Sequence, residues 1–137
     1  MLNFQQIQRT LGMILIALSC LAPFHAHAQA VGIKAKPLLR TSVSGDEHKE
    51  ALVLSIEFAP GATTGRHTHY GDEYATVLEG SLEIVSDGQA PRRINAGEAY
   101  HNERGVVHET KNTGNVPARI ISVFVVDKGK KLSTPAQ

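Results

Sequence analysis

From residue 31 onward, glycine, proline, asparagine and aspartate divide the chain into short segments, and no stretch of ten or more residues keeps a helical period. The segments alternate in polarity or are rich in β-branched residues, which is typical of strands. Strands are expected at residues 51–58, 73–79, 81–85, 92–95, 106–111 and 118–126. This regular spacing, with turn residues between the strands, predicts a single all-β domain, either a sandwich or a barrel of roughly eight strands.

Two of the expected strands indicate where the core lies. Residues 51–58 alternate, with leucine, isoleucine and phenylalanine at every second position, which predicts one buried face. Residues 118–126 are almost uniformly apolar, which predicts a strand buried on both faces. Residues 128–137 are mostly polar and basic, and we expect them to form a solvated C-terminal tail.

The charge and the cysteine content exclude several kinds of partner and site. The 14 lysines and arginines nearly balance 13 acidic residues, and the longest basic run is Lys130-Lys131, so the chain has no electrostatic footprint for nucleic acid. The single cysteine, Cys20, lies in the N-terminal segment. A domain that begins near residue 31 therefore has no disulfide, cysteine nucleophile or thiolate ligand, and would bind a metal through histidine, carboxylate and water.

The first thirty residues have the layout of a secretory signal. Arg9 precedes an apolar run, Leu11–Leu21, and small-x-small patterns end at Ala28 and at Ala30. We therefore expect a signal peptide over residues 1–28, cleavage after Ala28 or Ala30, and export to the periplasm or beyond. The apolar run is too short for a permanent anchor, so no stable membrane span is expected after cleavage. An uncleaved anchor, a packed N-terminal helix and a lipoprotein attached at Cys20 are the alternatives.

Three histidines and a glutamate are candidates for a metal site. His67 and His69 are two residues apart in a segment that glycines flank, so an extended backbone would place both imidazoles on the same face. Glu73 follows four residues later, and His108 lies near the start of the strand expected at residues 106–111. Two imidazoles and a carboxylate at close spacing are a recurrent way to bind a first-row divalent metal and leave coordination positions open.

The spacing of these residues resembles the cupin family. The first cupin motif, G-(x)5-H-x-H-(x)3 or 4-E-(x)6-G, is matched at every defined position, by Gly61, His67, His69, Glu73 and Gly80. The second, G-(x)5-P-x-G-(x)2-H-(x)3-N, is matched by Gly97, Gly105, His108 and Asn112. Glu103 stands at its proline position, so a rigid turn residue is lost but no metal ligand.

This resemblance implies a double-stranded β-helix, or jelly-roll barrel, over residues 31–127. It implies one divalent metal ion bound by the residues His67, His69, Glu73 and His108. Iron or manganese is favoured, and nickel, zinc or copper would also accept these ligands. The expected partner is a small organic substrate or ligand. A homodimer is a further expectation, because small cupins often pair through their sheets and the apolar segment 120–126 could contribute.

Two neighbouring residues, Tyr100 and His101, are the catalytic candidates, because either could act as a general acid or base. Each could instead be a packing or hydrogen-bonding residue, and His101 is also the rival fourth histidine. Tyr70, Tyr74 and Glu109 are further candidates for the pocket wall.

The interpretation of Glu73 as a metal ligand has an alternative. A salt bridge from Glu73 to Arg66 or Arg104 would remove that carboxylate from the ligand set.

Fold alone does not determine function. The first hypothesis is an exported metalloenzyme of the dioxygenase type, an oxidoreductase that resembles small flavonol-dioxygenase-like cupins. A metal-dependent isomerase or lyase is an alternative. A cupin that binds a metal or a small ligand without turnover is another, whereas a metal-dependent sensor has little support.

Overall fold

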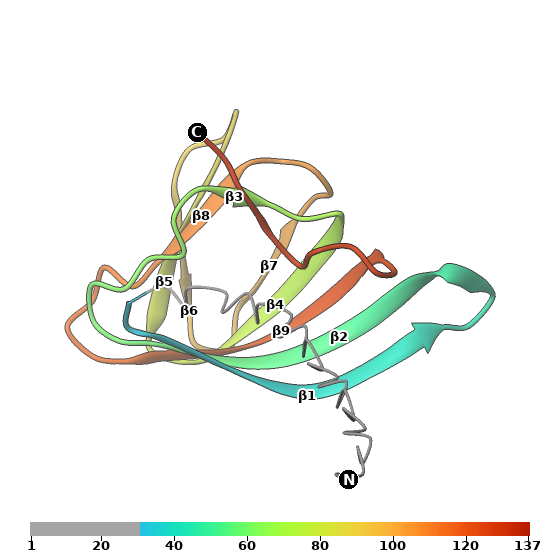
Figure 1. Ribbon diagram of the computed structural model, residues 1–137. Coiled ribbons are helices and arrows are strands. Elements are labelled where there is room, and N and C mark those ends of the chain that lie inside the picture. The colour runs from blue at the N-terminus through green and yellow to red at the C-terminus, as the bar shows by residue number, and fades with distance from the viewer. Residues whose placement is uncertain (1–30) are drawn as a thin grey trace, which may run out of the picture.

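The computed structural model describes residues 31–137, and it consists of strands and turns (Figure 1). The expected signal peptide and both of its cleavage positions lie outside the described residues. Within residues 31–137, no helix is long and apolar enough to cross a membrane.

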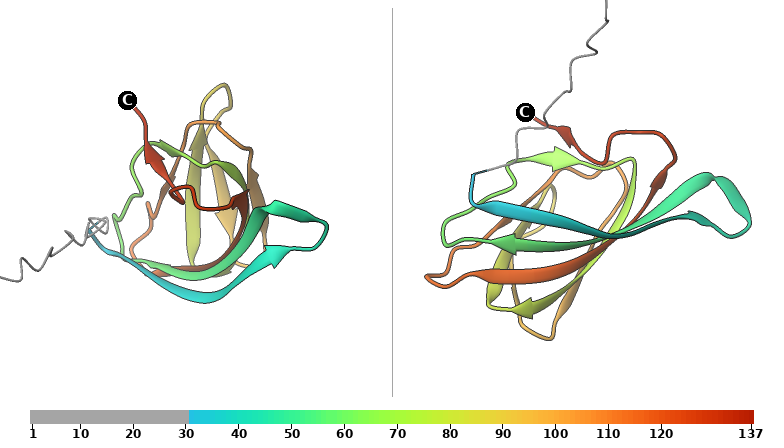
Figure 2. Two further views of the ribbon diagram at one scale, coloured as in Figure 1. Left: turned by 45° about the vertical axis from the view of Figure 1, so that its right-hand side comes forward. Right: turned by 60° about the horizontal axis from the view of Figure 1, so that its bottom comes forward.

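Ten strands form two antiparallel sheets of five strands each. They are β1 Ile33–Val43, β2 Asp46–Phe58, β3 His67–Thr68, β4 Gly71–Glu79, β5 Ser81–Ser86, β6 Arg92–Asn95, β7 Ala99–Asn102, β8 His108–Lys111, β9 Ala118–Asp127 and β10 Thr134–Pro135. The strand order is β1-β2-β9-β4-β7 in the first sheet and β10-β3-β8-β5-β6 in the second. The two sheets face each other, and the β1–β2 hairpin extends beyond the barrel (Figure 2). The all-β jelly-roll prediction is confirmed.

The expected strands are all present, but four strands were not predicted: β1, β3, β7 and β10. The sequence of β1 lacks a clear alternation because almost all of its residues are exposed, and Pro37 interrupts it near a register shift. Strands β3 and β10 have two residues each, which is too short for a periodic pattern to show.

The core lies between the two sheets. Strand β2 contributes Leu54, Ile56 and Phe58, as the alternation of residues 51–58 predicted. In β9, Ile120, Ser122 and Phe124 are buried, whereas Ile121 and Val123, which alternate with them, are only partly buried. The prediction that this strand is buried on both faces is therefore wrong. The strand is central in its own sheet, but only one of its faces meets the second sheet.

The C-terminal residues differ from the expected solvated tail. Residues 128–131 are exposed, but Leu132 packs against the core. Thr134 and Pro135 then form β10, which pairs with β3. The backbone N–H of Ala136 donates to the carbonyl of Arg66 at 2.9 Å. The chain end thus adds an edge strand next to the segment that carries His67.

Candidate metal centre

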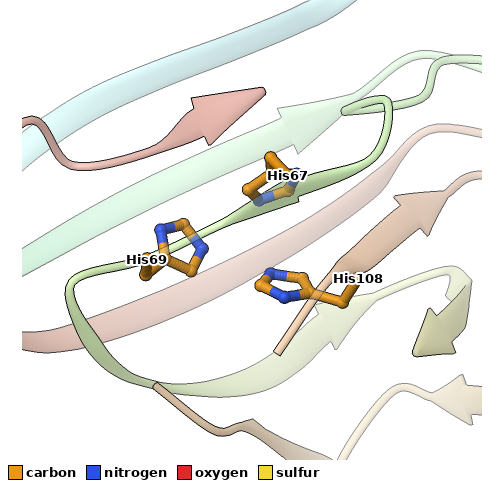
Figure 3. Close-up of side chains that lie close together, drawn as sticks. All are labelled: His67, His69 and His108. Carbon is orange, nitrogen blue, oxygen red and sulfur yellow. The ribbon is translucent and has the colours of Figure 1, made fainter. Parts of the chain in front are cut away.

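The fold brings His67, His69 and His108 together although His108 is distant in sequence. His67 on β3 is the direct cross-strand partner of His108 on β8, and His69 lies just after β3. The ring centroids are 4.8 Å apart for His67 and His69, 4.4 Å for His67 and His108, and 4.9 Å for His69 and His108. Figure 3 shows the three rings gathered around one point. One ligand atom from each ring lies within 4.8 Å of the other two.

Each of these imidazoles is held by a backbone carbonyl through its Nδ1 atom. The partners are Gly65 O for His67 at 2.8 Å, Leu132 O for His69 at 2.6 Å, and Val106 O for His108 at 3.0 Å. Because a carbonyl oxygen only accepts hydrogen bonds, Nδ1 must carry the proton, and the lone pair of a neutral ring is then on Nε2. All three rings are therefore fixed in the tautomer that leaves Nε2 free to bind a metal.

Burial favours the neutral form of two of these rings. Burial lowers the pKa of His108 to about 4 and also lowers the pKa of His67. Within residues 31–137, the buried Nε2 atoms of His69 and His108 have no hydrogen-bond partner. A buried polar atom without a partner costs stability, and a bound cation would satisfy both atoms. Metal ligation requires neutral imidazole, so the protonation state fits that role.

The carboxylate of Glu73 completes the cluster from β4. Its Oε1 accepts a hydrogen bond from Ser122 Oγ at 2.8 Å, and its Oε2 accepts one from Asn102 Nδ2 at 2.8 Å. The Oε2 atom lies 3.7 Å from Nε2 of both His69 and His108. Burial acts to raise the pKa of Glu73, but the nearby imidazole of His69 and the hydrogen bonds from Asn102 and Ser122 outweigh it and lower the pKa. The group therefore stays ionised although it is buried.

Neither arginine that could have paired with Glu73 does so. Arg66 forms a salt bridge with Asp87, and Arg104 forms one with Asp127. The structure thus places all four residues of the expected ligand set together. Three imidazoles and one carboxylate suit a first-row divalent metal, so the side chains fit such an ion.

A cavity of about 320 Å³ opens next to this cluster. The polar residues of its wall are His67, His69 and Glu73 of the cluster, together with Thr64, Arg66, Thr110 and Ser133. Most of the remaining wall is apolar and includes Leu54, Ile56, Phe58, Ile120, Phe124 and Leu132. A small, mainly apolar cavity with a few polar groups at one side is the usual form of a site for a small organic molecule.

The two catalytic candidates lie on opposite faces of β7. Tyr100 is buried and lines the cavity. Burial first, and then the charge of Glu73, raise the pKa of Tyr100 well above its usual range. Its hydroxyl, which interacts with Thr110 and Ser122, is therefore a neutral phenol that can donate a hydrogen bond.

His101 does not line this cavity. Its ring stacks on Tyr74 with centroids 4.6 Å apart, and its Nε2 lies 3.0 Å from Asp72 Oδ1. Because successive strand residues point to opposite faces, the outward position of His101 follows from the inward position of Tyr100. The structure therefore does not bring His101 to the histidine cluster.

The other expected wall residues also lie elsewhere. Tyr70 and Tyr74 are exposed, and the carboxylate of Glu109 accepts a hydrogen bond from Thr63 Oγ1 at 2.6 Å. In contrast, Asn102, Ser122 and Leu132 contact the cluster and were not predicted. Ser122 had a usable signal, because it is the one polar residue within the apolar run at residues 120–126.

The second cupin motif also has a structural role here. Asn112, its last residue, is buried and donates through Nδ2 to the carbonyls of Phe58 and Val116, at 3.1 and 2.8 Å. Its Oδ1 accepts the N–H of Gly114 at 3.0 Å. The side chain of Asn112 therefore joins the turn between β8 and β9 to the end of β2 through hydrogen bonds.

Comparison with known families matches the cupin domain to residues 54–124, which is just over half of the chain. The chain is a cupin. The matched region contains all four residues of the cluster and the central strands of both sheets.

The relatives of this cupin differ in the share of their length that it covers. It is 34% identical over 107 residues to the tetracenomycin polyketide synthase protein TcmJ of Streptomyces glaucescens, covering 77% of this chain and 67% of the relative. It spans only 32% to 43% of the length of several further curated relatives.

Solved structures confirm the fold. The DMSP lyase DddQ from Ruegeria pomeroyi has a TM-score of 0.62 at 17% identity, over 76% of this chain and 51% of the other. An oxalate oxidase in complex with glycolate has a TM-score of 0.57 at 24% identity, over 71% and 52% of the two chains. At these identities the similarity concerns the fold.

Proposed function

We propose that this cupin binds one divalent metal ion through His67, His69, Glu73 and His108 and acts as a small-molecule metalloenzyme of the dioxygenase type. The observation that carries the proposal is the arrangement of free Nε2 lone pairs beside a buried carboxylate at the edge of a cavity. A bound iron or manganese ion would supply Lewis acidity, redox chemistry and open coordination positions.

The protein side chains would provide the remaining functions. The apolar wall excludes water and favours a small organic substrate over a highly charged one. The neutral phenol of Tyr100 can donate a hydrogen bond to an oxygen atom of the substrate, because it lines the same cavity as Glu73. Glu73 keeps its negative charge, since Asn102 and Ser122 both donate to it.

A metal-dependent lyase or isomerase is the second candidate, and Tyr100 is the observation that favours it. A buried neutral phenol beside the cluster could give a proton to a leaving group or to a developing enolate oxygen. Such a reaction would proceed without O2, whereas a dioxygenase consumes it. Oxygen dependence therefore separates the two candidates.

The test begins with elemental analysis of the protein purified from its native compartment. Turnover of a panel of β-diketones, flavonols and small hydroxy acids is then compared with and without O2. Stoichiometric iron or manganese together with O2 consumption would support the dioxygenase. Turnover without O2 would favour the lyase or isomerase. Bound metal without any turnover would instead identify a binding protein.

The metal assignment has a separate test. The double variant His67→Ala/His69→Ala is expected to lose its metal content and to keep its β-sheet circular dichroism. A matched control, His48→Ala, removes an exposed histidine and should keep the metal. Full metal retention in the double variant would contradict the proposed site.

We also propose that the protein is exported, on the strength of its N-terminal layout alone. Cell fractionation of the full chain, followed by N-terminal sequencing, should recover a mature form that begins after Ala28 or Ala30. Recovery of the uncleaved chain in the cytoplasm would contradict export.

A further inference from the structure

The three Nδ1–carbonyl hydrogen bonds of the histidine cluster differ in their sequence range. His67 and His108 each bond the carbonyl two residues earlier in the chain, those of Gly65 and Val106. His69 instead bonds the carbonyl of Leu132, which is 63 residues away. The first two contacts are local, whereas the third exists only when the C-terminal segment is in place.

We propose that Leu132 is a positioning residue for the metal site. Its carbonyl fixes the Nδ1–H tautomer of His69, so the lone pair of His69 stays on Nε2 beside those of His67 and His108. Without this acceptor, a neutral His69 could carry its proton on either nitrogen, and the Nε2–H form cannot bind a metal through Nε2. This inference rests on the proposed metal-binding function.

Few contacts hold the segment that carries Leu132. Its strand, β10, pairs with β3 through two residues, Thr134 and Pro135. One backbone hydrogen bond follows at Ala136, and Leu132 packs at the margin of the core. The other nine strands have their own pairings in the two sheets. We therefore expect the barrel to persist when residues 132–137 are removed.

The side chains of the segment make a second contribution, because Leu132, Ser133 and Pro135 line the cavity. The carbonyl and the side chain of Leu132 can be separated by mutation. Leu132→Ala removes the apolar contact and keeps the backbone acceptor. Truncation after Lys131 removes both.

The first test measures the histidine tautomers of the metal-free protein by long-range ¹H–¹⁵N NMR at pH 8. In the wild type, all three rings should show the Nδ1–H form. In the protein truncated after Lys131, only His69 should shift to a mixture with the Nε2–H form, and His67 and His108 serve as internal controls. An unchanged His69 in the truncated protein would overturn the inference.

The second test measures the affinity for Mn²⁺ by isothermal titration calorimetry. Loss of a group that orients a metal ligand typically weakens binding by about 10- to 100-fold, and we expect this for the truncated protein. Leu132→Ala should stay within about threefold of the wild type, because its carbonyl remains. Leu38→Ala, at an exposed leucine of β1, is the matched control and should not change the affinity.

The outcomes separate the two proposals. Failure of the wild type to bind Mn²⁺ or any other divalent metal would contradict the proposed function, and the tautomer measurement would still test the role of Leu132. Equal Mn²⁺ affinity in the wild-type and truncated proteins would overturn only the inference. If the truncated chain loses its β-sheet circular dichroism, the full-length variant Thr134→Pro replaces it, because a proline there opposes the β10–β3 pairing that holds the Leu132 carbonyl against His69. Loss of the fold in both would show that the segment is part of the core and would also overturn the inference.

Discussion

Burial and polar neighbours have opposite effects on the charge of individual residues in the cluster. In His108 the side chain is almost fully covered, and its pKa falls to about 4 because burial penalises the charged imidazole. Glu73 behaves in the opposite way, since three polar neighbours stabilise its charged form and lower its pKa despite burial. Neutral imidazoles next to an ionised carboxylate are the state that a metal requires.

This difference predicts how the stability of the metal-free protein depends on pH. The pKa of His108 is about 4 in the folded state and about 6.5 in the unfolded chain, so between these values the unfolded state binds more protons. The free energy of unfolding therefore rises with pH in this window and falls as the solution is acidified from about pH 6.5 toward 4. Urea denaturation at pH 7 and pH 5 should show the decrease, and His108→Asn should reduce it. An equal decrease in the variant would contradict the assignment.

Replacing the carboxylate tests whether Glu73 binds the metal. Glu73→Gln keeps the size of the side chain and removes its charge, so Mn²⁺ affinity should fall about tenfold or more. The matched control is Glu109→Gln, whose carboxylate lies on β8 and bonds Thr63 and Lys111. Calorimetric titration of both variants measures the difference, and equal affinities would exclude Glu73 as a ligand.

At the scale of the elements, pairing between strands builds the site. The β3–β8 pairing places His67 opposite His108, and β4 lies between β9 and β7, so Glu73 is flanked by Phe124 and Asn102. The β4–β9 contact requires a close backbone approach at Gly71. A Cβ atom there would lie 2.0 Å from the carbonyl oxygen of Val125.

We therefore expect Gly71→Ala to destabilise the protein by about 3 kcal/mol, because the two strands would have to separate. The loss should also weaken metal binding, since Gly71 is two residues from Glu73. Gly114→Ala is the control, because a Cβ there meets only the Asn112 Oδ1 atom, at 3.3 Å. Chemical denaturation measures both variants, and a Gly71→Ala protein as stable as the control would contradict the prediction.

For the whole molecule, metal binding and folding are linked, because the ligands come from β3, β4, β8 and the segment after β3. An unfolded chain does not hold these residues together, so the metal binds the folded state preferentially. A metal concentration 100 times Kd would add about 2.7 kcal/mol, which corresponds to a rise in Tm of roughly 10 °C for a domain of this size.

Differential scanning calorimetry with Mn²⁺ and with EDTA should show this rise in the wild type. The His67→Ala/His69→Ala variant should show no rise. An equal shift in both proteins would indicate metal binding elsewhere.

The sequence predicted much of this protein because the signals are local. Strand alternation in residues 51–58 identified the core face of β2. The spacing of His67, His69 and Glu73 in a glycine-flanked segment indicated a shared ligand site, and the second cupin motif added His108. The first two relationships depend on backbone geometry over a few residues, so they can be read without a structure, whereas His108 came from the resemblance to the cupin family.

Other features were decided only by the tertiary structure. The alternation of Tyr100 and His101 shows that they point to opposite faces, but only the packing of β7 shows that Tyr100 faces the cavity. The outer face of β9 is only partly buried because the second sheet covers just one side of the strand. The C-terminal segment looked like a solvated tail because its sequence is polar, yet the Leu132 carbonyl binds His69. That contact joins residues 63 positions apart, and no local pattern in the sequence encodes which carbonyl will reach a buried imidazole.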